Sequence, residues 1–309
     1  MNFDKALALA VTYLRANIMF ALWGHPGIGK SALGQLLANQ FNLEFIDIRL
    51  GQIDPIDLNG FVHKDEVAGN FDYLPWARFP LAHTPLPPGK TGWLISFDEV
   101  NTAGRQHLAA AYRVFLDRMI GQAKLHPNCR LMMGGNLVGE GLAGALPSPL
   151  VSRVAHIVMN PEMTPSVCKI LGPSISAFLT SHPKFIYQES AEPNTPYPTL
   201  RTWEMIRTHQ LANANYGGTS LEAISGMVGN AAAVSYISFA MQEEELLETL
   251  KGVEAFPLER CQDLLEYLST DIIQLQRQLH RFPGEWHTIA KVKVESMING
   301  TSDPDSSFA

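Results

Sequence analysis

Cysteine, positive charge and long apolar runs are all scarce in this 309-residue sequence. Its three cysteines, Cys129, Cys168 and Cys261, lie far apart and form no C-x-x-C pair. This pattern excludes a disulfide framework or a cysteine-rich zinc site as the basis of the fold, and we expect reduced thiols. The ten histidines show no H-x-x-x-H or H-E-x-x-H spacing, so nothing supports a catalytic transition metal.

The charge balance is acidic, with 23 Lys and Arg against 30 Asp and Glu, a net charge of −7. Nucleic-acid binding depends on clustered lysine and arginine, so the balance argues against a nucleic-acid partner. The net charge does not describe how charges are distributed, so a local basic groove stays an alternative. No apolar run reaches the ~18 residues that cross a bilayer, and the amino end, with Asp4, lacks a signal-peptide cleavage site. We expect a cytoplasmic chain without membrane insertion.

Apolar residues make up 46% of the chain, enough for a sizeable core. The first half alternates apolar runs with segments of helical period, the βαβ pattern of a parallel sheet. The expected strands are residues 18–23, 43–48, 93–97, 130–134 and 154–159, and the expected helices are residues 3–15, 31–41 and 103–119. The Gly- and Pro-rich stretch 51–90 predicts an elaborated connection with a hairpin near residues 68–70.

Strand signals end after residue 160, and helical patterns follow at residues 165–182, 199–215, 219–241, 243–251 and 261–279. We therefore predict an α/β core over residues 1–160, a helical domain over 161–251 and a C-terminal helical extension over 252–309 with a frayed tail. The apolar spacing in 261–279 covers fewer than three heptads, which favours packing on the helical domain over a coiled coil.

The first expected strand runs into Gly24-His25-Pro26-Gly27-Ile28-Gly29-Lys30-Ser31, which matches G-x-x-x-x-G-K-[ST] between a strand and a helix. Glycines let backbone N–H groups converge on phosphates, and the following helix directs its positive end at the same anion. We expect residues 24–32, through Ala32, to bind a nucleoside triphosphate. Lys30 would neutralise the β- and γ-phosphates, and the Ser31 hydroxyl would ligate Mg²⁺.

Polar side chains follow two later strands. Asp98 and Glu99 end the strand at 93–97, and in a parallel sheet that end faces the ligand crevice. Asp98 is placed to hold Mg²⁺, and Glu99 to take a proton from the water that attacks the γ-phosphate. Two helix-capping acids are the alternative. Asn136, after the strand at 130–134, could bind the γ-phosphate and the attacking water, or could simply form a loop.

Two arginines complete the candidate set. Arg153 lies just before the fifth strand, and Arg201 opens a helix in the second half. A guanidinium can stabilise the charge on a transferring phosphoryl group, from the same or a neighbouring subunit. Taken alone, each arginine is better explained as an ordinary surface residue.

The order of these motifs resembles that of the AAA+ ATPases, specifically their MoxR-like and dynein-related branch. The resemblance is carried by GHPGIGKS, LISFDEVN, MMGGN, LPSPLVSR and PTLRTW, which span about residues 18–210. It implies a P-loop parallel-sheet core followed by a smaller all-helical lid. It also implies that Asn136 is the sensor-1 residue, Arg153 an arginine finger acting on a neighbour's ATP, and Arg201 the sensor-2 arginine.

The resemblance further implies ATP and Mg²⁺ as cofactors and a homo-oligomeric ring, usually a hexamer, that remodels a protein partner. Many members work beside a protein with a von Willebrand A domain. Two other classes stay open: a nucleic-acid-associated ATPase, such as a translocase or helicase loader, and a small-molecule P-loop kinase. Phe71, Tyr73 and Trp76 in the 51–90 connection either line a ring pore or anchor the connection to the core.

Overall fold

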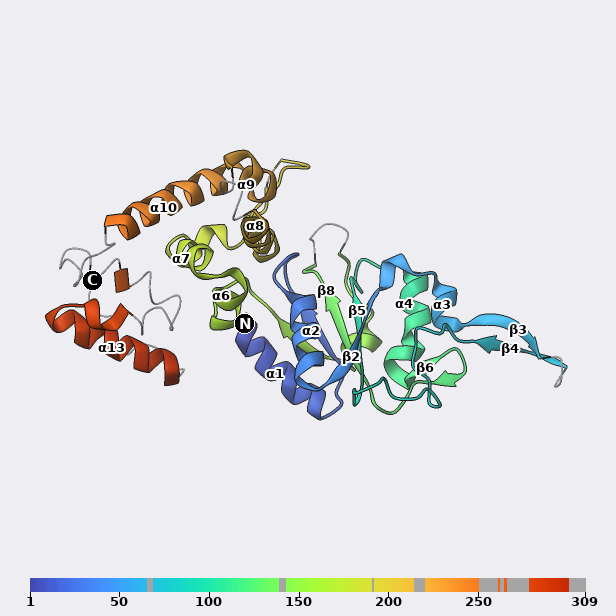
Figure 1. Ribbon diagram of the computed structural model, residues 1–309. Coiled ribbons are helices and arrows are strands. Elements are labelled where there is room, and N and C mark those ends of the chain that lie inside the picture. Colours follow the sequence, from blue (N-terminus) through green and yellow to red (C-terminus); the bar gives the residue numbers. More distant parts are fainter. Residues whose placement is uncertain are drawn as a thin grey trace. The chain divides into compact units, whose positions relative to one another are not determined.

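The computed structural model forms two compact units, Met1–Pro161 and Glu162–Ala309 (Figure 1). It describes residues 1–65, 69–138, 143–190, 192–213, 220–249, 261, 264–265 and 278–299. None of the helices in these ranges is long and apolar enough to cross a membrane.

The first unit is built on a five-stranded parallel sheet in the order β2-β5-β8-β1-β9, which confirms the predicted α/β class. The strands are β1 (Phe20–Trp23), β2 (Leu43–Arg49), β5 (Gly92–Asp98), β8 (Cys129–Gly135) and β9 (Ala155–Val158). The first strand lies inside the sheet, between the two that come last in the sequence. Such a reversal of strand order opens a crevice at the carboxyl ends of the strands, where α/β sheets bind ligands.

Helices cover both faces of this sheet (Figure 1). On one face lie α1 (Phe3–Arg15) and α2 (Lys30–Gln40), and on the other lie α4 (Arg105–Tyr112) and the π-helical turn η2 (Arg113–Asp117). Alternate strand residues supply the core on the α4 side, where Ile95 and Phe97 pack with buried side chains of α4 and η2. Helix α2 approaches the sheet closely, since a Cβ on Gly34 would lie 3.0 Å from the sulfur of Met132.

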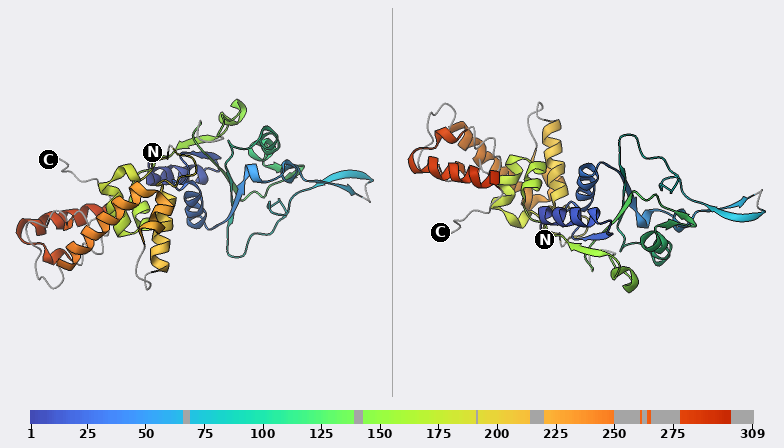
Figure 2. Two further views of the ribbon diagram at one scale, coloured as in Figure 1. Left: turned by 90° about the horizontal axis from the view of Figure 1, so that it is seen from above. Right: turned by 90° about the horizontal axis from the view of Figure 1, so that it is seen from below.

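The connection from β2 to β5 contains η1 (Leu50–Gln52), α3 (Pro55–Asn59) and a hairpin of β3 (Phe61–Asp65) and β4 (Asn70–Leu74). The hairpin confirms the expectation for this stretch, and residues 66–68 at its turn lie outside the described ranges. A capping box holds the short α3, because Asp54 accepts from Ile56 N and Asp57 accepts from Asp54 N. In all the ribbon views the hairpin extends away from the central sheet (Figure 2).

The helix predicted for residues 103–119 is too long. The chain leaves the π-helical turn at Arg118, a left-handed residue with φ 55°, and forms a small hairpin of β6 (Met119–Ile120) and β7 (Ala123–Lys124). A second element absent from the sequence-based expectation is α5 (Ser148–Val151), a single turn before β9. Both elements are too short for a periodic apolar pattern to reveal them.

The described residues of the second unit are helical, without a strand. The elements are α6 (Pro165–Leu171), α7 (Pro173–Ser181), η3 (Pro183–Phe185), α8 (Leu200–Ala212), α9 (Leu221–Val228), α10 (Asn230–Thr249), η5 (Leu279–Arg281) and α13 (Gly284–Asn299). Aromatic side chains from several of them meet: the Phe178 ring lies 5.3 Å from those of both Trp203 and Tyr236. The Trp203 indole donates to Phe185 O at 2.8 Å, which satisfies the buried N–H.

Glycine divides two of the predicted helices. The 165–182 pattern breaks at Gly172 (φ 79°), and the 219–241 pattern breaks at Gly229 (φ 80°). The separate helix predicted for 243–251 is wrong, because α10 continues to Thr249. Most of the helix predicted for 261–279, and the tail after 299, lie outside the described residues. A separate extension over 252–309 stays a prediction.

Candidate functional site

The phosphate-loop motif forms the connection between β1 and α2, at the carboxyl edge of the sheet. Gly27 (φ 74°) and Gly29 (φ 96°) have left-handed backbone conformations that residues with a Cβ adopt at a cost. At Gly24 a Cβ would lie 2.7 Å from Met159 O. Three of the motif glycines are therefore required by the path of the chain, and α2 starts at Lys30 with its free N–H groups beside the loop.

Lys30 lies at the centre of the loop. Its side chain is 9% exposed, and Nζ donates to Gly24 O at 2.6 Å, to His25 O at 2.9 Å and to Asn136 Oδ1 at 3.0 Å. The ammonium thus joins the loop after β1 to the residue that follows β8. Charge-assisted bonds of this kind are the stronger ones in proteins, so the three acceptors define its position closely.

Ser31 and Asp98 form a second link across the site. The Ser31 hydroxyl donates to Asp98 Oδ2 at 3.0 Å, and the other carboxylate oxygen accepts from Glu99 N at 2.8 Å. The neighbouring strand β8 has a glycine, Gly134, beside Asp98. A Cβ at that position would lie only 2.5 Å from Asp98 Oδ1. The glycine pair Gly134-Gly135 therefore makes room for side chains from neighbouring strands.

Glu99 has an uncommon backbone conformation, with φ 55° at a residue that is not glycine. The turn that follows supports it, since Glu99 O accepts both from Thr102 N at 3.1 Å and from Thr102 Oγ1 at 2.9 Å. Left-handed residues of this kind cost ~1–3 kcal/mol and tend to occur at functional sites. The turn places Glu99 directly after the carboxylate that faces the phosphate loop.

The sequence motifs assign no role to Asn101, yet it fixes the position of Asn136. Its side-chain amide donates to Asn136 O at 2.8 Å and to Gly144 O at 3.2 Å, and its Oδ1 accepts from Asn136 N at 3.1 Å. The residue is 5% exposed. Its position two residues after the acidic pair is a sequence signal that could have drawn attention to it. Its need for partners follows from its burial, which only the structure shows.

The two candidate arginines are placed differently. Arg153 is exposed in the first unit, just before β9, and its Nη1 donates to Pro149 O at 3.2 Å. Arg201 is exposed in the first turn of α8, in the second unit. Among the described hydrogen bonds of the first unit, none joins Arg153 to the residues around Lys30. Their predicted roles stay predictions.

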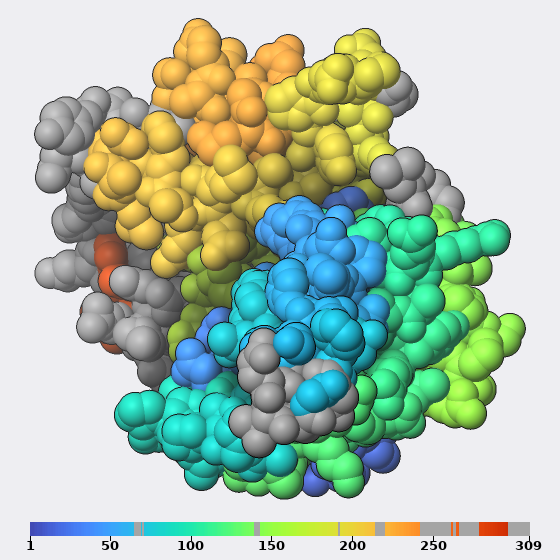
Figure 3. Space-filling model, turned by 90° about the vertical axis from the view of Figure 1, so that its right-hand side faces the viewer, coloured from blue at the N-terminus to red at the C-terminus, as the bar shows by residue number. Residues whose placement is uncertain are grey.

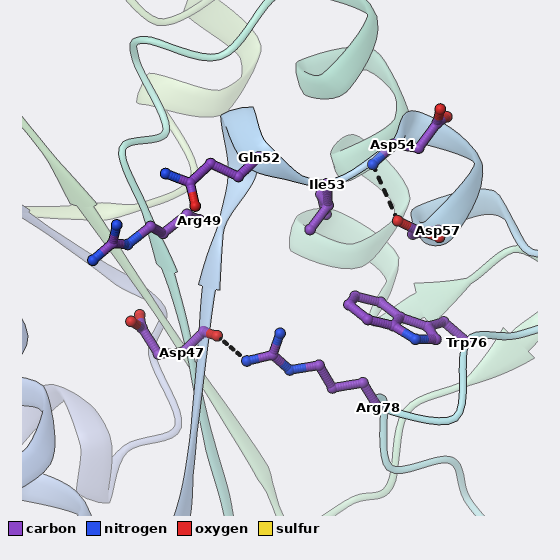
Figure 4. A pocket seen from close by; sticks show the side chains of 8 residues that line it. All are labelled: Asp47, Arg49, Gln52, Ile53, Asp54, Asp57, Trp76 and Arg78. Carbon is purple, nitrogen blue, oxygen red and sulfur yellow. Dashed lines mark hydrogen bonds between the residues drawn. The ribbon is translucent and has the colours of Figure 1, made fainter.

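A cavity of about 490 Å³ opens at the carboxyl end of β2, the edge strand beside β5 (Figure 4). It is lined by Asp47, Arg49, Gln52, Ile53, Asp54, Asp57, Trp76 and Arg78. The Asp47 and Arg49 side chains point the same way from β2, while Trp76 and Arg78 come from the other side of that strand. Arg78 donates to the backbone carbonyl of Asp47, and its guanidinium lies 5.5 Å from the Trp76 ring centre.

Asp47 carries the one raised carboxyl pKa described for this region. Burial raises its pKa most, and the nearby Asp98 raises it further, while Arg49 and Arg78 oppose the change. Its Oδ1 is buried and has no hydrogen-bond partner among the described residues. The Asp47 carboxylate therefore lies close enough to Asp98 and Glu99 for their negative charges to disfavour its ionisation.

No family model and no curated protein sequence matches this chain. Solved structures of similar fold include NtrX from Brucella abortus in complex with ADP, at 13% identity and a TM-score of 0.45, over 96% of this chain and 67% of that chain. The NtrX complex with ATP gives 14% identity and a TM-score of 0.43, over 95% and 67%. A protein of Cytophaga hutchinsonii whose name assigns it provisionally as an ATPase is 15% identical, with a TM-score of 0.36. The match covers 97% of this chain and 86% of that chain. Because these scores and identities are low, the similarities carry no information on the ligands of this chain.

The chain's own geometry defines its class. A parallel sheet in the order β2-β5-β8-β1-β9, with the phosphate-loop motif between β1 and α2, is a P-loop α/β fold with AAA-like strand order. The predicted site residues Lys30, Ser31, Asp98 and Asn136 meet at its carboxyl edge.

Proposed function

We propose that this chain is an AAA+ ATPase that binds ATP with Mg²⁺ in the phosphate loop and hydrolyses it. One observation carries the proposal. Two side chains at the start of α2, Lys30 and Ser31, are hydrogen-bonded to Asn136 and Asp98, at the ends of the neighbouring strands β8 and β5. A phosphate-loop motif by itself supports nucleotide binding. Its hydrogen bonds to polar residues at the ends of β5 and β8 support hydrolysis.

The donor set fits both cofactors. Hydroxyl and carboxylate oxygens are the ligands that Mg²⁺ prefers, and Ser31 Oγ and Asp98 Oδ2 lie 3.0 Å apart. Bound Mg²⁺ supplies charge neutralisation on the phosphates. Lys30 Nζ, now held by the Gly24 and His25 carbonyls, is the cation that would exchange those acceptors for phosphate oxygens.

Glu99 is the residue proposed to take the proton from the attacking water, since a carboxylate next to the phosphate-facing strand end is a suitable general base. Asn136 would orient that water, because its side-chain Oδ1 accepts from Lys30 and its backbone N–H and C=O are both bonded to the Asn101 side chain. A neutral amide in a rigid position orients a nucleophile without repelling the phosphates.

The finer function follows the MoxR-like resemblance. In this proposal copies of the chain form a ring, a hexamer by analogy with the family. Arg153 reaches ATP on the adjacent copy, and Arg201 senses the nucleotide from the lid. Support for the first role is that Arg153 is exposed while its backbone is anchored between the buried Leu150 and Val154. The ring would remodel a protein partner, with a von Willebrand A domain protein as a candidate, in the cytoplasm.

The test measures ATP hydrolysis and particle mass against protein concentration for the wild type, Glu99→Gln and Arg153→Ala. We expect activity to rise as the ring forms, and both variants to bind ATP while hydrolysing it slowly. Concentration-independent hydrolysis by a monomer, with Arg153→Ala fully active, would contradict the shared site.

Two further readouts separate the other classes. Phosphate transferred to an acceptor instead of released would identify a small-molecule kinase. Stimulation by single- or double-stranded nucleic acid at low salt would favour a nucleic-acid-associated ATPase.

A further inference from the structure

The indole ring of Trp23 spans three strands at the carboxyl edge of the sheet. Trp23 is the last residue of β1 and is aligned with Gly135 of β8 on one side and Val158 of β9 on the other. A Cβ on Gly135 would lie 2.8 Å from Trp23 Cε3, so the benzene side of the indole covers that glycine. The opposite side of the ring carries the N–H and turns toward β9.

The indole N–H is bound to an exposed histidine. Trp23 Nε1 donates to His156 Nδ1 at 2.8 Å, and the planes of the two rings are nearly parallel, 15° apart, with centroids 5.8 Å apart. The other imidazole nitrogen, Nε2, lies 2.9 Å from Val151 O. An indole only donates and a carbonyl only accepts, so the two bonds together require a neutral imidazole that accepts at Nδ1 and donates at Nε2.

Val151 is the last residue of α5 and lies two positions before Arg153. The turn is compact: Ser152 N donates to Ser148 O at 3.2 Å, and Arg153 N donates to Leu150 O at 3.1 Å. Leu150, with 0% of its surface exposed, anchors the turn in the core. A bond to the Val151 carbonyl therefore holds the backbone that carries Arg153.

We propose that His156 is a positioning residue that couples the phosphate loop to Arg153, through Trp23 on one side and Val151 O on the other. This inference rests on the proposed function, in which Arg153 serves a neighbouring copy. Trp23 is followed directly by Gly24, the first residue of the phosphate loop. The imidazole thus bridges two parts of one subunit. One is the end of β1, which leads into that subunit's own phosphate loop, and the other is the turn that carries Arg153 toward the neighbouring subunit.

The first experiment compares steady-state ATP hydrolysis by the whole protein for the wild type, His156→Phe and His156→Gln. Phenylalanine keeps a ring against the indole and removes both hydrogen bonds, while glutamine keeps one acceptor and one donor. We expect His156→Phe to lower kcat about tenfold with ATP affinity within about twofold, since small misplacements of a catalytic group have large effects. His156→Gln should keep kcat within about threefold of the wild type.

A double-mutant cycle with Trp23→Phe tests whether the two residues act through one bond. We expect the double variant Trp23→Phe, His156→Phe to be no slower than the slower single variant, because both changes remove the same link. Effects that multiply would overturn the coupling, as would equal kcat values for His156→Phe and the wild type. Equal loss in His156→Phe and His156→Gln would assign the effect to packing instead and also overturn it.

Mixing subunits separates failure of this inference from failure of the proposed function. Glu99→Gln subunits lack the base but keep Arg153, so they should restore hydrolysis at intact sites of His156→Phe subunits in mixed rings. A mixture that stays at the mean of its two components would overturn the positioning of Arg153 by His156. An Arg153→Ala variant with wild-type activity would instead refute the shared site itself.

Discussion

Two regions of the first unit carry the residues singled out in the sequence, and they are built in opposite ways. At the ends of β1, β5 and β8, polar side chains are bound to groups from other elements, as Lys30 is to Asn136 and Ser31 is to Asp98. On the hairpin β3–β4, apolar side chains face water: Phe71 is 72% exposed, Val62 59% and Leu74 53%. Figure 3 views the molecule from the hairpin's side.

The contrast separates two ways in which a fold presents function. Side chains at the strand ends are held in position before any ligand arrives, which lowers the cost of reorganisation on binding and reaction. Side chains of the hairpin bury little surface and so contribute little to stability, while exposed apolar groups are typical of surfaces that meet partners. Substitutions should therefore have large effects at the strand ends and small effects at the hairpin.

The largest effect should come from Glu99→Gln, which removes the proposed base and keeps the shape of the side chain. We expect kcat for ATP hydrolysis to fall about 10²–10⁴-fold, the usual contribution of a general base, with ATP binding retained. Glu44→Gln, at an exposed position on β2, is the matched control and should be as active as the wild type. Undiminished hydrolysis by Glu99→Gln would exclude this residue as the base.

Asn101→Ala should have the next largest effect, because it removes three hydrogen bonds around Asn136 and Gly144. A typical hydrogen bond contributes about 0.5–1.5 kcal/mol to stability, so the loss of these three partly buried bonds should lower the free energy of unfolding by about 2–4 kcal/mol. Thermal and denaturant unfolding of the whole chain measure it. Asn128→Ala at the amino end of the same sheet removes one partly exposed bond, to Thr91 O, and is the control.

The sheet and the phosphate loop were predictable because their signals are local. Buried parallel strands appear as continuous apolar runs, and the P-loop motif fixes a strand, a turn and a helix within a few residues. The α/β class was confirmed, and Lys30, Ser31, Asp98 and Asn136 meet as the carboxyl ends of parallel strands require. The chemical roles of Glu99, Arg153 and Arg201 stay predictions.

Contacts between distant segments were not predictable in the same way. Asn101 and His156 act through backbone carbonyls, and nothing in the sequence indicates which carbonyl a side chain will reach. The predicted helix ends were wrong for a related reason. Gly172 ends α6 where the Arg207 guanidinium occupies the space that a Cβ would need, and that crowding comes from the later helix α8.

Asp47→Asn should raise stability slightly. Because the folded-state pKa of Asp47 is raised above its ordinary value, the ionised carboxylate destabilises the fold fully above the folded pKa, and this cost disappears as the pH falls below the unfolded pKa. The gain at neutral pH should stay under about 1 kcal/mol, because Asp47 is only partly buried and water screens its charge. Unfolding midpoints at neutral and at acid pH check it. A gain that is the same at both pH values would show that the charge is not the cause.

The smallest effect should come from Phe71→Ser, which tests the other side of the comparison. Phe71 lies on β4 opposite Lys64, with most of its ring in water, so removing the ring gives up little buried apolar area. We expect the free energy of unfolding to change by less than about 0.5 kcal/mol, as for surface substitutions in general. Phe97→Ala, at a ring with 0% exposure in the core of the central sheet, should instead cost about 3–5 kcal/mol. A loss of more than about 1 kcal/mol for Phe71→Ser would mean that the hairpin packs against its own chain. The aromatic residues of the 51–90 connection would then be explained as anchors to the core and not as the lining of a ring pore.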